Sequence, residues 1–161
     1  MEVSEAIIHD LVVKVAEALT ADGKMLVTAE SCTGGLIGAS CTELAGSSAW
    51  FFGGVMSYAN EAKVRGLGVS EQTLATYGAV SEETVVQMCA GALALGGDIA
   101  VAVSGVAGPG GGSKEKPVGC VYIGWQHKGQ PAQVERCLFS GDRKGIRDAT
   151  VIRALEGVLS L

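Results

Sequence analysis

The sequence predicts a single three-layer α/β/α domain built around a mixed β-sheet, and three observations support this prediction. Segments with apolar residues at helical spacing alternate along the chain with short strand-like runs, which is typical of α/β folds. The run at residues 98–104 is apolar almost throughout, as in a strand buried on both faces of a sheet. Near the end of the chain, strand-like runs at 118–127 and 133–139 flank a turn, which predicts an antiparallel hairpin. With 161 residues the chain can bury one core, so we expect one domain over residues 1–161.

The first part of the chain predicts two helices and two strands. Ser4 is expected to cap a first helix that ends near residues 22–23, because apolar residues recur there at helical spacing. The mainly apolar run at 25–30 predicts a strand, and residues 36–44 predict the next helix. After a Gly-Ser-Ser segment, the run at 50–58 predicts a second strand.

The remaining helices are predicted from their capping residues. Side-chain oxygens of Ser, Asn and Asp accept hydrogen bonds from the first N–H groups of a helix, and acidic residues in the first turn add to this effect. The helices expected on this basis span about 60–65, 70–77, 81–95 and 142–159, and they are capped by Asn60, Ser70, Ser81 and Asp142.

Charge and composition exclude several classes of protein. The chain carries 12 Lys and Arg against 17 Asp and Glu, with no long basic block, which disfavours nucleic acid as a partner. No uninterrupted apolar run reaches the ~18 residues that a membrane span needs. The first ten residues lack the basic start of a signal peptide. We therefore expect a cytoplasmic protein with no membrane partner, and a homo-oligomer is left open.

The cysteines and histidines predict neither disulfides nor a metal site. The five cysteines include no C-x-x-C pair, and three of them (Cys89, Cys120 and Cys137) lie among apolar residues. Reduced, buried side chains are therefore expected. His9 falls in the first helix and His127 in the hairpin turn, where both are expected at the surface. Because no clustered Cys/His spacing is present, the residues predict no metal.

Residues 28–35, TAESCTGG, follow an apolar run and precede a helix-like segment. A hydroxyl on such a strand-to-helix turn can act as a nucleophile, with backbone N–H groups beside it that can hold an oxyanion. Ser31 is the candidate hydroxyl. Cys32 stays open as an alternative, because adjacent side chains on a turn point in different directions and only one of them can face a pocket.

A serine hydroxyl needs a base, and the histidines are badly placed to supply one. Lys63 is expected near the start of the helix capped by Asn60. The positive field of the helix start, partial burial and the nearby Arg65 would lower its pKa, and a neutral lysine can act as a general base. Tyr58, five residues earlier, would position substrate or relay a proton. An ordinary solvated lysine and a buried strand-end tyrosine are the alternatives.

A glycine-rich loop at 105–113 follows the buried strand, at the place where α/β proteins bind ligands. It matches neither a P-loop nor a dinucleotide fingerprint, because the lysine and the third glycine are in the wrong places. It predicts a concave stretch of backbone that can approach an anion or a planar ring. Arg143, at the start of the last helix, offers a cation for phosphate. A flexible loop and a surface charge are the alternatives.

Seven segments in this order strongly resemble the CinA C-terminal domain family: TAESCTGG, AGSSAWF, SYANEAK, YGAVSEETV, SGVAGPGGG, EKPVG and FSGDR. The resemblance covers roughly residues 5 to 160. It implies a nicotinamide-nucleotide amidohydrolase that converts nicotinamide mononucleotide to nicotinate mononucleotide and ammonia. It also implies a Ser/Lys pair that uses neither metal nor cofactor, with a small-molecule nucleotide as the partner.

The resemblance assigns roles to residues of this sequence. Ser31 becomes the nucleophile and Lys63 the base, with Tyr58 assisting. Two other functions remain: a non-catalytic nucleotide-binding or regulatory domain, and an NAD-type oxidoreductase that the Tyr–Lys spacing disfavours. The residues expected to bind substrate are Cys32, Thr33, Gly34, Gly35, Ser47, Ser48, Asn60, Gly105, Gly108, Gly110, Gly111, Gly112, Ser113 and Arg143.

Overall fold

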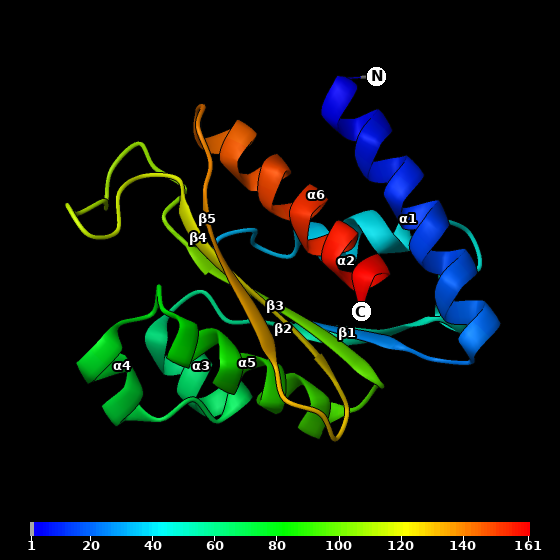
Figure 1. Ribbon diagram of the computed structural model, residues 1–161, viewed down its shortest axis with the longest axis horizontal. Helices are drawn as coiled ribbons and strands as arrows, with labels where there is room; N and C mark the ends of the chain where they lie inside the picture. The colour runs from blue at the N-terminus through cyan, green and yellow to red at the C-terminus, as the bar shows by residue number, and fades with distance from the viewer. Residues whose placement is uncertain (1) are drawn as a thin grey trace.

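A five-stranded mixed sheet forms the middle layer of the computed structural model, which describes residues 2–161 (Figure 1). The strands lie in the order β2-β1-β3-β4-β5. β1 pairs in parallel with both β2 and β3, whereas β4 and β5 are antiparallel to their neighbours. This arrangement confirms the predicted mixed sheet. The strands are β1 (Leu26–Glu30), β2 (Phe51–Met56), β3 (Ile99–Gly105), β4 (Cys120–His127) and β5 (Gln133–Leu138).

Helices cover both faces of the sheet, which confirms the three-layer prediction (Figure 1). α1, α2 and α6 pack on one face, and α3, α4 and α5 on the other. Each face buries its own apolar cluster. The helices are α1 (Val3–Asp22), α2 (Leu36–Thr42), α3 (Asn60–Leu67), α4 (Glu71–Tyr77), α5 (Glu82–Leu95) and α6 (Arg143–Ser160), with a short 3₁₀ turn, η1 (Ser47–Ala49), before β2.

Three of the five predicted helix caps are confirmed. The side chains of Ser70, Ser81 and Asp142 each accept a hydrogen bond from the backbone N–H three residues later. The predictions for Ser4 and Asn60 are wrong, because both residues lie inside their helices. Glu2 and Ala59, in extended backbone conformation, precede α1 and α3 without any capping side-chain bond.

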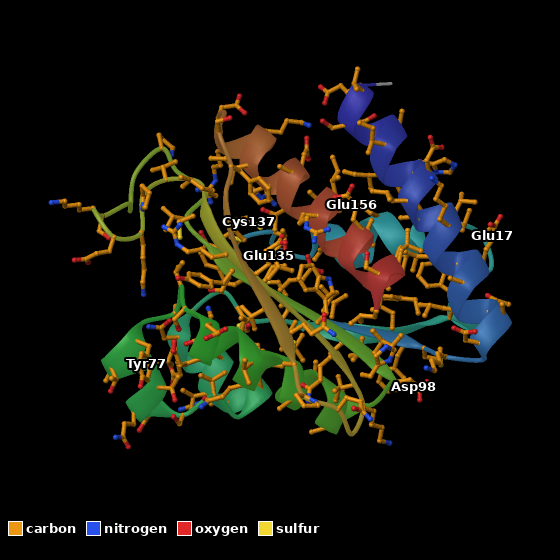
Figure 2. All side chains as sticks on the ribbon, in the orientation of Figure 1. Glu17, Tyr77, Asp98, Glu135, Cys137 and Glu156 are labelled. Carbon is orange, nitrogen blue, oxygen red and sulfur yellow. The ribbon has the colours of Figure 1, made fainter. Side chains whose placement is uncertain are left out.

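Packing between the layers follows the predicted burial of small and apolar residues. All five cysteines are free and buried, so the predictions for Cys89, Cys120 and Cys137 are confirmed. Figure 2 shows the side chains of Glu135 and Cys137 where β5 faces α6. The Glu135 carboxylate accepts hydrogen bonds of 2.6 Å and 3.0 Å from Arg153, which fastens this strand to the helix.

The structure also tests the predicted exposure of the two histidines and the length of apolar helices. His9 is exposed, as predicted, but His127 is half-buried at the end of β4. No helix among residues 2–161 is both long and apolar enough to cross a membrane.

The carboxyl ends of β1, β2 and β3 meet at the same edge of the sheet, because these strands are parallel. The strand-to-helix turn after β1, the segment before α3 and the glycine-rich loop after β3 therefore come together. This edge is the place where α/β sheets bind ligands.

Candidate active site

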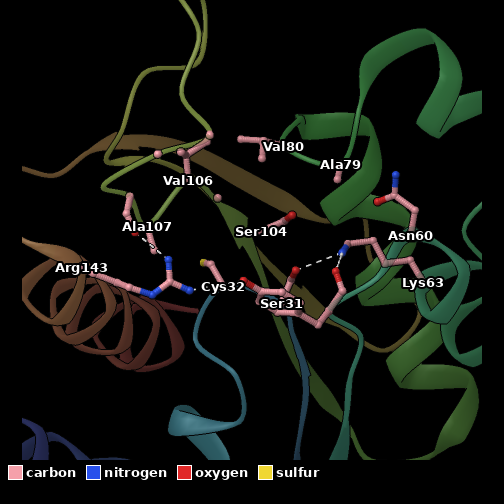
Figure 3. Close-up of a pocket in the computed structure, with 15 residues that line it drawn as sticks. Ser31, Cys32, Asn60, Lys63, Ala79, Val80, Ser104, Val106, Ala107 and Arg143 are labelled. Atoms are coloured by element: carbon pink, nitrogen blue, oxygen red, sulfur yellow. Dashed lines mark hydrogen bonds between the residues drawn. The ribbon is translucent and has the colours of Figure 1, made fainter.

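A pocket of about 290 Å³ lies at the carboxyl edge of the three parallel strands (Figure 3). Its walls come from the turn after β1, the segment after β2, the loop after β3 and the start of α6. Ten of the residues expected from the sequence line it: Ser31, Cys32, Tyr58, Asn60, Lys63, Gly105, Gly108, Gly110, Gly111 and Arg143.

A serine hydroxyl and a lysine amine meet inside this pocket. Lys63 Nζ lies 3.0 Å from Ser31 Oγ (Figure 3). It also lies 2.8 Å from the carbonyl oxygen of Ser57 and 3.1 Å from that of Tyr58. Only 7% of Ser31 and 1% of Lys63 are exposed to solvent.

The three oxygen contacts of the amine can be satisfied by either protonation state of lysine, and its neutral form is the one that burial favours. A protonated amine has three hydrogens and no acceptor, whereas a neutral amine has two hydrogens and one lone pair. In the neutral form, the Ser57 and Tyr58 carbonyls, which can only accept, take the two hydrogens. The lone pair is then left for the Ser31 hydroxyl, which is the arrangement that a general base requires.

The pKa of Lys63 is lowered, and burial is the main cause. The expectation that Arg65 contributes is not supported. Its guanidinium forms an ion pair with Glu61 at 2.8 Å, and both side chains are largely exposed, so solvent screens their charges. The prediction of a perturbed lysine thus holds through burial rather than through a neighbouring cation, and the solvated alternative is wrong.

The lowered pKa predicts a pH dependence of stability. Between the lowered pKa of Lys63 and its usual value of 10.5, the unfolded chain binds a proton that the folded protein does not. The free energy of unfolding should therefore rise with pH across this window and fall as pH decreases. We expect urea denaturation to show this rise in the unchanged protein relative to Lys63→Met.

The Met variant controls for the other titrating groups in this range. Burial raises the pKa of the buried cysteines, for example Cys41 and Cys89 to about 12, which acts in the opposite direction in both proteins. The difference in the free energy of unfolding between the two proteins therefore reports the titration of Lys63. A difference that stays constant with pH would contradict the lowered pKa.

Two charged residues that the sequence analysis missed hold the turn around Ser31. The buried Glu30 carboxylate accepts hydrogen bonds from Thr33 Oγ1 at 2.6 Å and from the N–H groups of Ile37 and Gly38 at 2.8 Å and 3.0 Å. It thereby caps the start of α2. An acidic residue shortly before a helix was the signal for this role.

Arg147 holds the same turn through its backbone carbonyls. Its guanidinium, on α6, donates hydrogen bonds to the carbonyl oxygens of Cys32 and Thr33 at 3.2 Å and 2.9 Å. No local pattern indicated this contact, because 114 residues separate Arg147 from Thr33. The turn is thus fixed to both α2 and α6.

Replacing Glu30 with glutamine is expected to destabilise the protein by about 1–3 kcal/mol, because the amide places donor hydrogens against groups that need an acceptor. Urea denaturation measures this loss. The control is Glu43→Gln, at the exposed end of α2, where a change within about 0.5 kcal/mol is expected. Equal stabilities for the two variants would show that the carboxylate does not hold the turn.

Several residues expected to bind substrate lie outside the pocket lining. Thr33, Gly34 and Gly35 belong to the turn, but they do not face the cavity. Gly112 and Ser113 lie farther along the loop, where the Ser113 N–H donates to the Lys116 carbonyl at 2.9 Å.

Ser47 and Ser48 lie at the opposite edge of the sheet from the pocket. They form η1, which precedes the start of β2 next to the first residue of β1. Because the pocket follows the ends of these parallel strands, the length of a strand separates both serines from it. The expectation that Ser47 and Ser48 contact substrate is therefore wrong for this pocket.

Tyr58 and Arg143 lie together at the rim of the pocket. The Tyr58 side chain is 60% exposed, so the alternative of a buried tyrosine is wrong. Its hydroxyl accepts a hydrogen bond from Arg143 Nη2 at 3.3 Å, and Arg143 Nη1 donates to the Gly108 carbonyl at 2.6 Å. Since the carbonyl of Tyr58, not its phenol, contacts Lys63, the geometry favours substrate positioning over proton relay.

The Cys32 thiol also lines the pocket, but its environment disfavours nucleophilic attack. Burial raises its pKa to about 11, so the thiol stays protonated near neutral pH. The thiolate, rather than the thiol, is the nucleophile of cysteine chemistry. The alternative left open at Cys32 is weakened accordingly.

The sequence analysis missed five residues of the pocket lining: Ala79, Val80, Ser104, Val106 and Ala107. Val106 and Ala107 belong to the glycine-rich loop, so its motif already indicated their region. Ser104 is the last residue of the apolar run at 98–104 and is buried in the sheet. Within residues 2–161, no group of three or more His, Cys, Asp and Glu side chains is placed to hold a metal ion.

These features define an α/β protein whose candidate active site sets a serine hydroxyl against a buried lysine amine. The family model described as CinA C-terminal domain matches residues 8–161. The chain belongs to this family, which confirms the resemblance seen in its motifs.

Relatives and solved structures agree with this assignment. The nicotinamide-nucleotide amidohydrolase PncC of Enterobacter agglomerans is 50% identical over 157 residues, which cover 97% of this chain and 96% of the relative. The protein of the same name from Escherichia coli K12 is 49% identical over 144 residues, covering 89% of this chain and 87% of the relative. The crystal structure of the competence/damage inducible protein CihA from Agrobacterium tumefaciens superposes with a TM-score of 0.93 at 45% identity, covering 96% and 94% of the two chains.

Proposed function

We propose that this chain is a nicotinamide-nucleotide amidohydrolase that converts nicotinamide mononucleotide to nicotinate mononucleotide and ammonia by a Ser/Lys mechanism. The observation that carries this proposal is the 3.0 Å contact between Lys63 Nζ and Ser31 Oγ in a pocket at the ligand-binding edge of the sheet. The names of its relatives supply the substrate class. The lowered pKa of Lys63 supports its role as the base.

The reaction would proceed in two halves. Neutral Lys63 accepts the proton of Ser31, and Oγ attacks the carboxamide carbon. When the tetrahedral intermediate collapses, the C–N bond breaks and protonated Lys63 gives its proton to the leaving nitrogen, which departs as ammonia. Lys63 then removes a proton from water as the water oxygen attacks the ester carbon. The bond to Ser31 Oγ breaks, Lys63 returns the proton to Oγ, and nicotinate mononucleotide is released.

The oxyanion of the intermediate needs hydrogen-bond donors, and the backbone N–H groups of residues 32–35, beside Ser31, are the candidates. The Gly34 N–H is already engaged, because it donates to the Ser31 carbonyl at 3.0 Å. In the described part of the chain, the Cys32 N–H has no such carbonyl partner, and Cys32 lines the pocket. We propose this N–H as a donor, and a well-placed donor contributes roughly 3–4 kcal/mol to the transition state.

The anionic phosphate would bind at the rim of the pocket. Arg143 lies there, and residues of the Gly105–Gly111 segment line the same wall. Because the net charge of the chain is −5, the overall field repels an anion, so local donors must supply the attraction. Tyr58, held by Arg143, would pack against the substrate ring or ribose.

Ammonia release from nicotinamide mononucleotide tests the proposal directly. Purified protein is mixed with the nucleotide, and ammonia and nicotinate mononucleotide are followed over time, with heat-unfolded protein as the blank. Equal release of both products is expected. Binding of the nucleotide without any release would favour the second candidate, a regulatory nucleotide-binding domain.

A further inference from the structure

Ser104 is a buried hydroxyl beside the proposed nucleophile to which no role has been assigned. β1 and β3 are parallel, and their register pairs Glu30 with Val103. Ser31 follows Glu30 directly and Ser104 follows Val103 in β3, so the two serines lie at the carboxyl ends of neighbouring strands, where both line the pocket. Figure 3 shows the Ser104 hydroxyl in the wall of the pocket near Ser31 and Lys63.

The hydroxyl of Ser104 is left unpaired by the protein. Only 1% of Ser104 is exposed, and no hydrogen bond joins its Oγ to another atom of residues 2–161. In that range the fully enclosed side-chain atom without a partner is Gln126 Oε1, so the Ser104 Oγ keeps access to the pocket that it lines. Most other buried hydroxyls have partners, such as Thr33 Oγ1 with Glu30 and Thr150 Oγ1 with the Ile146 carbonyl, whereas Thr28, outside this pocket, shares the lack of one. Buried polar groups in folded proteins are normally paired, so an unpaired hydroxyl that faces the pocket of Ser31 and Lys63 is available to a ligand bound there.

Lys63 does not need this hydroxyl. Its amine already contacts Ser31 Oγ and two carbonyl oxygens, which accounts for two hydrogens and a lone pair. The donor of Ser104 is therefore free for the substrate.

The strand order decides which substrate atom Ser104 meets. Lys63 approaches Ser31 from the β2 side of β1, whereas Ser104 stands on the β3 side. The leaving nitrogen must face Lys63 to receive its proton, so the carbonyl oxygen of the carboxamide faces the other side.

We propose that Ser104 is a further catalytic residue, whose Oγ donates a hydrogen bond to the carbonyl oxygen of the substrate carboxamide as that oxygen becomes the oxyanion. The proposal rests on the amide hydrolysis proposed above and adds a side-chain donor to the Cys32 N–H. Because the bond strengthens as negative charge develops, it acts on the transition state more than on bound substrate.

The test compares Ser104→Ala with the unchanged protein on nicotinamide mononucleotide. We expect kcat to fall by about 10²–10³-fold, with a much smaller change in KM. The thermal midpoint should not fall, because the lost hydroxyl has no partner in the protein. Ser104→Thr, which keeps a hydroxyl, should recover part of kcat.

The matched control is Thr150→Val in α6, a buried hydroxyl outside the pocket that bonds within its own helix. It should lower the thermal midpoint and leave kcat unchanged, the reverse of Ser104→Ala. A kcat of Ser104→Ala within about threefold of the unchanged protein would overturn the proposal, since the loss of an oxyanion donor costs far more. A loss of kcat that is matched by a lower thermal midpoint would overturn it as well, because Ser104 would then be structural.

A second probe separates this proposal from the proposed function. A fluorophosphonate labels a nucleophilic serine without any amide, and its phosphoryl oxygen takes the place of the oxyanion. Slower labelling of Ser31 in Ser104→Ala would support the role of Ser104 even if nicotinamide mononucleotide were not hydrolysed. Equal labelling rates in the two proteins, or no labelling of the unchanged protein, would overturn it.

Discussion

Replacing Ser31 with alanine is expected to lower the turnover of nicotinamide mononucleotide by at least about 10³-fold, because losing the nucleophile of a covalent mechanism removes the whole catalytic unit. Binding of the nucleotide and the thermal midpoint should change little. Among the described side chains, the Ser31 hydroxyl forms a hydrogen bond only with Lys63, so the alanine variant loses only this contact. Ammonia release measures turnover, and calorimetric titration measures binding.

Cys32→Ala is the matched control for this experiment, because it removes one buried polar side chain from the next position of the same turn. Its thiol has a pKa of about 11 and is protonated under assay conditions, so turnover should stay within a few-fold of the unchanged protein. If Cys32→Ala were inactive and Ser31→Ala active, the nucleophile would be the thiol. Activity in both variants would exclude covalent catalysis from this turn.

Lys63→Met is expected to reduce turnover about as much as Ser31→Ala, since residues that act as one catalytic unit do not contribute additively. Methionine fills a similar volume, but it has no lone pair basic enough to accept the serine proton. Lys63→Arg keeps the charge and the donors and should also be inactive, because arginine does not release its proton at usable pH. The double variant Ser31→Ala with Lys63→Met should be no slower than either single variant.

Lys63→Met has a matched control, and the role of Lys63 also predicts a pH dependence of turnover. Lys14→Met removes an exposed lysine of α1 and should leave turnover unchanged. In the unchanged protein, kcat/KM should rise with pH and level off once Lys63 has lost its proton, with a midpoint below 10.5. A profile that falls over this range, or an active Lys63→Met, would remove Lys63 from the mechanism.

Much of the fold could be predicted from local patterns. The alternation of helical and strand-like periods, together with one hairpin, indicated the mixed three-layer architecture. Ser70, Ser81 and Asp142 were identifiable as caps because their side chains bond N–H groups only three residues away. Ser4 and Asn60 failed as caps. A capping residue must also have an extended backbone conformation just before the helix begins. Which residue has it depends on the path of the preceding segment in the folded protein.

The candidate site was predicted where motifs follow strands and missed where contacts are long-range. The turn at Ser31 and the loop from Gly105 face one pocket because parallel strands end at one edge. Glu30 signalled its role weakly as an acid before a helix, whereas Arg147 reaches the turn from a helix 114 residues away. Ser104 looked like any residue of an apolar strand.

The sequence by itself determined which residues form helices and strands, where the nucleophile turn and the glycine loop occur, and which side chains could supply a nucleophile and a base. Only the tertiary structure decided that Lys63 is buried against Ser31, that Ser47 and Ser48 face the opposite edge, and that Ser104 stands beside Ser31. The physical reason is that periodicity and capping depend on neighbours within a few residues. Burial, pKa and cross-strand contacts depend instead on the strand order β2-β1-β3, which brings distant segments together.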